Sequence, residues 1–289
     1  MPGRAGLRRA RAAAQLLGAR EERTAVEVVE HLLAVNAQHL GATRQMLAAR
    51  GAGGLDEALA DGSLVIAWLL RGTLHVVRPA DYAWLHPLCA PRQRAGSRRR
   101  LGQLGVSEPQ AARAVELIAE AVARGPRTRA ELAEACAAEG IPTAGQATPH
   151  LIGRAAIEGV LVAVGERVYG PPPAAAPPVS EPLSELCWRY LRAHAPAEAA
   201  DLAAWSGLPL GQARTALARA GSVDVAEPPA RIPPVRLPAF DEYLLGSKDR
   251  SFAVPDRLAK EVHPGGGMLR AVTTDDGLVT GTWKASDER

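Results

Sequence analysis

The sequence predicts a mainly α-helical protein with small β-sheets, in which short groups of helices are each followed by a β-hairpin. Three observations support this fold class. Apolar residues recur at three- and four-residue spacing over much of the chain, which places them on one face of a helix. Runs of apolar and β-branched residues follow the helical stretches in pairs. The 289 residues, 47% hydrophobic and 22% charged, suit a globular chain of about two domains or several very small ones.

The first predicted unit spans residues 1–105. Apolar side chains at helical spacing between Ala10 and Arg50 predict consecutive amphipathic helices. Thr24 and Glu27 form an S/T-x-x-E capping box, which places a helix start there. After a short helix near 55–60, two β-runs are expected, at 63–70 and 73–77. Helices followed by a hairpin are the order of a winged helix.

The second unit, residues 106–170, shows this order more clearly. Three helices are expected, over 107–124, 128–139 and 148–158. Ser107 caps the first helix, and Thr128 with Glu131 forms a capping box for the second. Two short β-runs, 160–164 and 167–169, then predict a tight hairpin at Gly165. This order predicts a winged helix-turn-helix with its third helix in the recognition position.

The rest of the chain continues the pattern and then changes. Residues 171–180 are rich in Pro and Ala and form a semi-rigid linker. A third unit, 181–235, has helices expected over 181–193, 197–205 and 210–220, but prolines obscure its hairpin. The last region, 236–289, has strands near 269–273 and 278–283 with Gly277 as a hairpin signal. The fold class is therefore tandem winged helix-turn-helix domains followed by a small β region.

Composition excludes several classes of protein. The longest strongly apolar run, Leu64–Leu70, is far shorter than the roughly 20 residues of a membrane-spanning helix. The basic N-terminus lacks the apolar segment of a secretory signal, so a cytoplasmic protein is expected. The three cysteines are widely spaced and form no CxxC pair. No metal site, phosphate-binding loop or other cofactor motif is expected.

The basic residues are almost all arginines. Of the 34 basic residues only Lys248, Lys260 and Lys284 are lysines, and the net charge is +3. Arg98, Arg99 and Arg100 close a run of arginines that contains no acidic residue. A solvated helix face and a nucleic-acid patch both fit such a run.

A second polar group lies on a predicted strand. Arg71, Thr73 and His75 alternate with apolar residues, so they are expected to share one strand face. These side chains are either solvent-exposed without a binding role, or they contact the phosphate backbone of a nucleic acid.

Two amides stand where an apolar helix is predicted to end. Asn36 and Gln38 follow the run Leu32–Val35 and lie two positions apart. On a helix their side chains would diverge by about 200°, whereas on an extended segment they would face one cleft. A solvated helix end and a functional amide pair both fit the sequence.

Five blocks of sequence resemble the bacterial AlkZ/YcaQ-type DNA glycosylases. They are Leu33–Gln38, Arg71–Val77, Pro149–Gly159, Ala200–Gly207 and Leu237–Gly246. They follow one another in the family's order across nearly the whole chain. The resemblance implies three winged helices and a C-terminal β-barrel, here partial, that form a concave basic channel around double-stranded DNA. It also implies hydrolysis of the N-glycosidic bond of bulky N-alkylated purines, as in self-resistance or crosslink repair.

The resemblance also assigns site residues. The family's catalytic Gln-x-Gln or Gln-x-Asp aligns with Asn36-Ala37-Gln38, which implies that Asn36 and Gln38 are catalytic in a monofunctional, cofactor-free and monomeric glycosylase. Asn stands where the family has its first Gln. DNA contacts are expected from Arg71, Thr73, His75, Arg98, Arg99 and Arg100. Asp241 and Tyr243 are expected to anchor the start of the barrel.

An alternative is a non-enzymatic tandem winged-helix DNA-binding protein, such as a regulator. In that protein the helix 148–158 would read the major groove through His150 and Arg154. The neighbouring Ala155, Ala156 and Ile157 count against a sequence reader, because such a helix usually carries more polar side chains.

Overall fold

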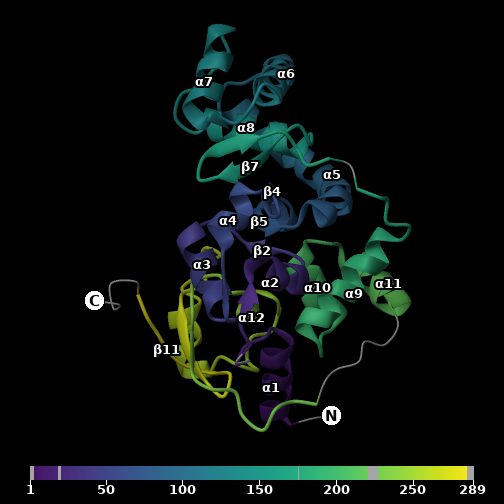
Figure 1. The fold of residues 1–289 in the computed structure, drawn as a ribbon, viewed down its shortest axis with the longest axis vertical. Helices are drawn as coiled ribbons and strands as arrows, with labels where there is room; N and C mark the ends of the chain where they lie inside the picture. The colour runs from purple at the N-terminus through teal and green to yellow at the C-terminus, as the bar shows by residue number, and fades with distance from the viewer. Residues whose placement is uncertain (1–2, 19–20, 175, 221–226, 285–289) are drawn as a thin grey trace. The chain divides into compact units, whose positions relative to one another are not determined.

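The computed structural model describes residues 3–18, 21–174, 176–220 and 227–284 (Figure 1). The chain divides into two compact units, one formed by residues 1–55 and 181–289 and the other by residues 56–180. The first expected segment, 1–105, contributes to both units. The five consecutive domains expected from the sequence stay a prediction. Within the described residues, no helix has the length and apolar character needed to cross a membrane.

The first unit begins with short helices joined by extended segments. They are α1 (Arg4–Ala14), β1 (Arg23–Thr24), α2 (Ala25–Leu32), β2 (Val35–Asn36), α3 (Leu40–Ala48) and β3 (Ala52–Gly53), with β1 and β3 paired in parallel. The expected capping box opens α2: the Thr24 backbone N–H donates to Glu27 Oε2 at 2.7 Å, and the Glu27 N–H donates to Thr24 Oγ1 at 3.2 Å. The helix start predicted from the sequence is therefore confirmed.

Three helices of the first unit follow the linker close to their expected positions. They are α9 (Pro182–His194), α10 (Ala199–Ser206) and α11 (Leu210–Ala220). Part of the region expected to contain the hairpin of the third unit, 221–226, lies outside the described residues.

The last elements of the first unit form a small sheet with two short helices. They are β9 (Val235–Leu237), α12 (Glu242–Leu245), α13 (Asp256–Val262), β10 (Val272–Asp275) and β11 (Leu278–Thr282). The antiparallel order is β11-β10-β9, and the expected hairpin turns at Asp276 and Gly277, both with positive φ. Ala12 of α1 and Leu17 pack in one core with Leu237 and Val279. The two ends of the chain therefore build one hydrophobic core.

The second unit contains the elements from residue 56 to 180. After α4 (Leu55–Ala60) they are β4 (Val65–Trp68), a 3₁₀ turn at Leu70–Gly72, β5 (Leu74–Val77), α5 (Pro79–Gln103), α6 (Glu108–Ala123), β6 (Arg127–Thr128), α7 (Arg129–Ala138), α8 (Ala147–Ile157), β7 (Val162–Gly165) and β8 (Val168–Gly170). The expected order of three helices and a hairpin is present from α6 to β8. The expected cap at Ser107 is present as part of a capping box with Gln110, and the expected capping box at Thr128 is present as well.

The two hairpins of this unit join in one antiparallel sheet, with the strand order β5-β4-β7-β8-β6. Ile66 of β4 pairs with Ala163 of β7, so the hairpin expected at the end of the first domain extends the hairpin of the second. Helix α8 packs against α5, α6 and β4, and none of its residues is exposed. The helix expected in the recognition position is therefore a buried central helix.

Candidate active site

The Asn36 segment begins where α2 ends at an unusual residue. Leu33 has φ of 73° and ψ of −52° and is fully buried, although a positive φ is usually found at glycine. This backbone turn ends the helix, and Val35 and Asn36 continue in an extended strand. The extended alternative of the sequence analysis is therefore the one observed.

The backbone of Asn36 is held on both sides. Its N–H donates to Glu242 Oε1 at 3.2 Å, and its carbonyl oxygen accepts a hydrogen bond from Thr43 Oγ1 at 2.9 Å. The second oxygen of Glu242 accepts a hydrogen bond from Trp205 Nε1 at 2.9 Å, and Glu242 is fully buried. A buried carboxylate with two N–H donors fixes the position of the strand, because moving either donor would leave buried charge uncompensated.

The two side-chain amides contact each other. Asn36 Nδ2 donates to Gln38 Oε1 at 3.2 Å, and the Gln38 backbone N–H donates to Asn36 Oδ1 at 3.2 Å. Asn36 is 6% exposed, whereas Gln38 is exposed. The asparagine is thus locked by its partners and orients the glutamine. Gln38 keeps one carbonyl lone pair and its amide N–H groups for an external group.

Residues 237–246, which include Glu242, pack against the Asn36 segment and are themselves held by buried polar contacts. Arg50 and Asp241 form a bidentate ion pair, with distances of 3.0 Å from Nη1 to Oδ2 and 2.9 Å from Nη2 to Oδ1. Both side chains are buried, at 0% and 2% exposed. Tyr243 Oη donates to the carbonyl oxygen of Gly277 at 2.8 Å, which ties α12 to the β10–β11 turn. These contacts agree with the anchoring role expected for Asp241 and Tyr243.

Arg71, Thr73 and His75 do not share one exposed strand face. Arg71 lies in the 3₁₀ turn with φ of 55°, before β5 begins, and it is exposed. His75 is fully buried, and its Nδ1–H donates to the Thr73 carbonyl oxygen at 2.9 Å. Burial lowers the pKa of His75 to about 3, with a smaller contribution from Arg71. The expected surface role of His75 is corrected: its ring is neutral and enclosed, so it offers no contact to a phosphate.

The arginine run lies on the last turns of α5, where Arg98, Arg99 and Arg100 are exposed. Arg100 Nε lies 3.5 Å from His150 Nε2, so the structure brings these two predicted DNA-binding residues together. Burial, followed by the charge of Arg100, lowers the pKa of His150. Arg154 differs, because it is 8% exposed and its guanidinium pairs with Glu108 at 2.8 Å and Glu158 at 2.9 Å. The expected DNA contact of Arg154 is corrected, since its donors are engaged inside the unit.

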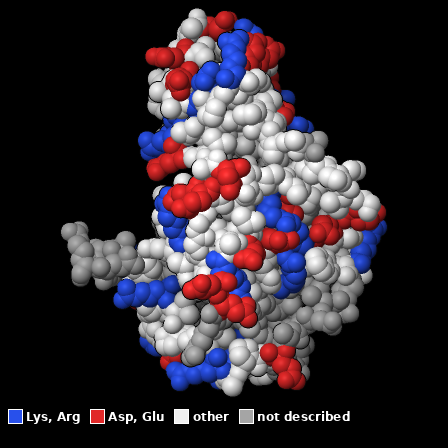
Figure 2. Space-filling view, viewed as in Figure 1, with Lys and Arg blue, Asp and Glu red and all other residues white. Residues whose placement is uncertain are grey.

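Other arginines serve structural roles. Arg9 Nε pairs with Asp276 at 2.8 Å, and Arg11 Nη2 pairs with Asp201 at 3.2 Å. The hydrogen bond from Arg9 is the main cause that lowers the pKa of Asp276 to about 2. On the face shown in Figure 2, acidic and basic side chains are interspersed. The arginine-rich N-terminal helix therefore stabilises the fold.

The cysteines and potential metal ligands show no catalytic arrangement within the described residues. Cys89, Cys136 and Cys187 are buried thiols, and burial raises the pKa of Cys89 to about 12 and that of Cys187 to about 11. No cluster of three His, Cys, Asp or Glu side chains able to hold a metal ion occurs in the described parts of the chain.

Sequence reasoning missed Thr43, Trp205 and Glu242 as supports of the amide pair. Glu242 lies 206 positions from Asn36 in the chain, so no local spacing could connect the two. The one signal was the acidic pair Asp241-Glu242 inside an otherwise apolar block, because buried acids need nearby donors.

The comparisons with known proteins agree with this architecture. The Streptomyces sahachiroi DNA glycosylase AlkZ has a similar fold, with a TM-score of 0.79 and 22% sequence identity over 100% of this chain and 89% of that chain. No curated protein matched significantly. The family model for DNA glycosylase AlkZ-like proteins matches residues 29–289, most of the chain. The chain therefore belongs to the AlkZ-like DNA glycosylase family.

Proposed function

We propose that this protein hydrolyses the N-glycosidic bond of bulky, cationic N-alkylated purines in double-stranded DNA, with Asn36 and Gln38 as its working amides. The observation that carries the proposal is the hydrogen bond of 3.2 Å between the two side chains, which leaves Gln38 exposed on a rigidly held segment. Membership of a DNA glycosylase family supports the reaction class. We further propose that the enzyme is monofunctional, monomeric and independent of a cofactor.

The reaction suits such a sparse site. Alkylation at N7 gives the purine a positive charge, so the base leaves without a strong general acid. The enzyme then needs to stabilise an oxocarbenium-like sugar and to orient a water molecule. Preorganised amide dipoles supply this stabilisation electrostatically. Normal bases lack the charge and are expected to remain uncleaved.

The two amides have different roles. Gln38 Oε1 accepts a hydrogen bond from the attacking water, and Asn36 Nδ2 holds that oxygen in place. Asn is one methylene shorter than the Gln of the family motif, which displaces its amide by about 1.5 Å. Because a misplacement of about 1 Å can cost a factor of about 100 in rate, slow excision is expected.

DNA binding is proposed for exposed or half-exposed cationic and polar side chains of the second unit. The exposed ones are Arg71, Arg98, Arg99 and Arg100, and the half-exposed ones are Thr73 and His150. In this proposal the elements from α6 to β8 form a winged helix. The first and third helix groups of the chain are further winged helices in tandem with it, and the β9–β11 sheet belongs to a partial barrel. Affinity should fall steeply as salt concentration rises, because each phosphate contact releases counterions.

A single-turnover assay of base release from duplex DNA with one N7-methylguanine tests the proposal. We expect slow release by the wild type and a rate at least about 100-fold lower for Gln38→Ala, with equal DNA affinity and melting temperature. Asn36→Gln should release the base faster than the wild type. Equal, background-level release by the wild type and Gln38→Ala would exclude the enzyme.

The regulator alternative has little structural support. A reading helix must present polar side chains to base edges. In α8, Arg154 is engaged with two carboxylates, and His150 is only half-exposed. The same assay separates the two functions, because a regulator would bind DNA without releasing a base.

A further inference from the structure

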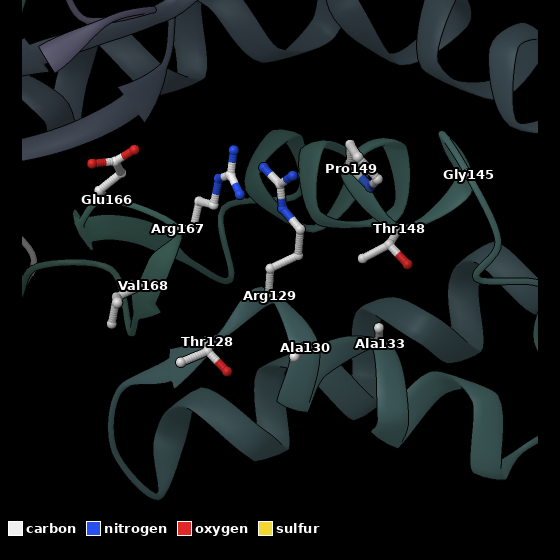
Figure 3. A pocket seen from close by; sticks show the side chains of 10 residues that line it. All are labelled: Thr128, Arg129, Ala130, Ala133, Gly145, Thr148, Pro149, Glu166, Arg167 and Val168. Atoms are coloured by element: carbon white, nitrogen blue, oxygen red, sulfur yellow. The ribbon is translucent and has the colours of Figure 1, made fainter.

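The second unit contains an open cavity of about 530 Å³ that the proposed chemistry does not use (Figure 3). It lies between the start of α7, the start of α8 and the turn between β7 and β8. Its lining residues are Thr128, Arg129, Ala130, Ala133, Gly145, Thr148, Pro149, Glu166, Arg167 and Val168. Small apolar side chains form most of its wall, and two arginines supply its positive charge.

Neither arginine has a partner for its guanidinium among the described residues. Arg129 Nε is buried without a hydrogen-bond acceptor. In Figure 3 both guanidinium groups extend in the same direction, away from the backbone of their own elements. Glu166, the one acid among the lining residues, forms no ion pair with them, and nearby Glu131 is held by Thr128 at 2.7 Å. Two like charges in one cavity repel each other, so a bound anion would relieve an unfavourable arrangement.

Arg167 occupies a backbone position that does not suit arginine. Its φ is 57°, a left-handed conformation that Gly or Asn adopts more readily. Its carbonyl oxygen accepts a hydrogen bond from the Arg129 N–H at 3.1 Å, so the turn is fixed to the start of α7. A long cation kept at a strained turn, beside a second cation, indicates that its side chain has a role outside folding.

We propose that this cavity binds a phosphodiester group of duplex DNA. Guanidinium groups recognise phosphate through paired N–H donors, and two of them surround one cavity. The first turn of α8 also lines it, and this helix has no side-chain cap, so its positive end adds to the attraction. The apolar wall of Ala130, Ala133 and Val168 suits a sugar beside the phosphate better than it suits a free, fully hydrated anion. The inference rests on the proposed function, and it names a DNA contact that the sequence did not indicate.

The test measures binding of a fluorescent duplex with one N7-methylguanine by anisotropy over a series of NaCl concentrations. The variants are Arg129→Gln, Arg167→Asn and the double variant. Arg113→Gln is the matched control, because it removes the same charge from an α6 residue that pairs with Glu116 and Glu139 and does not line the cavity. We expect the double variant to bind about tenfold more weakly and its salt slope to fall by about one to two, with no change for the control.

Stability provides an independent readout. Arg167→Asn should keep or raise the melting temperature, because asparagine tolerates the left-handed turn better, while DNA binding weakens. Unchanged affinity and salt slope in the double variant would overturn the inference. A second result would also overturn the inference: inorganic phosphate raises the melting temperature of the wild type, while the variants bind DNA with normal affinity. The cavity would then be a site for small anions and not for DNA. Arginine-dependent DNA binding without base release would retain the inference and exclude the proposed function.

Discussion

At the scale of single residues, Glu242 controls the position of the amide pair. We predict that Glu242→Gln lowers stability by about 1–3 kcal/mol, because its new NH₂ group would face an N–H donor of Asn36 or Trp205. The base-release rate should fall while the Kd for DNA stays unchanged, because Glu242 positions Asn36 without touching DNA. Single-turnover rates, anisotropy and urea unfolding separate these effects. A normal rate would show that the amide pair does not depend on Glu242.

The Arg50–Asp241 pair allows a quantitative test. Both side chains are buried, so removing one leaves an uncompensated charge in the core. We predict that Asp241→Asn and Arg50→Met each cost about 3–5 kcal/mol of unfolding free energy. The double variant should cost clearly less than the sum of the two, because no isolated charge remains. Urea unfolding of all four proteins measures the coupling, and strict additivity would contradict it.

The sequence placed Asn36 and Gln38 at a helix end but could not choose between helical and extended geometry. Leu33 decides this by adopting a positive φ of 73°, although nothing in its residue type indicates it. His75 shows a different limit of prediction from sequence, which concerns burial and not backbone geometry. Strand alternation predicted an outward side chain, yet the ring is buried and its Nδ1–H bonds to the Thr73 carbonyl oxygen. Alternation identifies a face, and tertiary packing determines whether that face is covered.

At the scale of elements, α12 is attached closely to α9. A Cβ on Gly246, the residue after α12, would lie 2.1 Å from His194 Cδ2 and 2.8 Å from the Glu242 carbonyl oxygen. We predict that Gly246→Ala lowers stability by about 1–3 kcal/mol through overpacking. Gly211→Ala in α11 is the control, because nothing lies within 4 Å of its added Cβ. It should be neutral or stabilising by up to about 1 kcal/mol. Thermal unfolding compares them, and equal effects would contradict the close packing.

Helix starts were predictable because their signals are local. The predicted capping boxes at Thr24 and Thr128, and the predicted cap at Ser107, each involve residues three apart and are all present. The pairing of β4 with β7 was not predictable, because Ile66 and Ala163 are far apart in the sequence. The length of α5 was hidden by Pro87 and Pro91, which lie inside a 25-residue helix. Local chemistry therefore predicted elements, and long-range pairing determined how they assemble.

At the scale of the whole molecule, the arginine content serves two purposes that composition alone cannot separate. Arg8 and Arg9 join the first helix to Asp276 near the other end of the chain, and Arg11 joins it to Asp201. Arg98, Arg99 and Arg100 remain exposed on α5. Arg98 also pairs with Glu108 at 3.5 Å, but 69% of its side chain is exposed. A count of basic residues therefore overstates the DNA-binding surface, because many arginines are buried in ion pairs inside the fold.

Each unit contains a buried neutral histidine, which predicts how the stability of the molecule responds to acid. Burial lowers the pKa of His75 and of His194 to about 3, whereas an unfolded histidine titrates near 6.5. Between these values the unfolded state binds more protons, so acidification favours unfolding by about 1.4 kcal/mol per pH unit for each histidine. Asp276, whose pKa is lowered to about 2, adds to this loss of stability only below about pH 4, because the unfolded carboxyl then binds a proton that the folded one does not. We predict that urea unfolding shows stability falling steadily from pH 6.5 to 4.5. In the His194→Gln variant, the slope of unfolding free energy against pH should decrease by the equivalent of about one bound proton, whatever the effect of the substitution at pH 7. A wild-type stability that stays constant over this range would mean that these histidines are protonated in the folded protein.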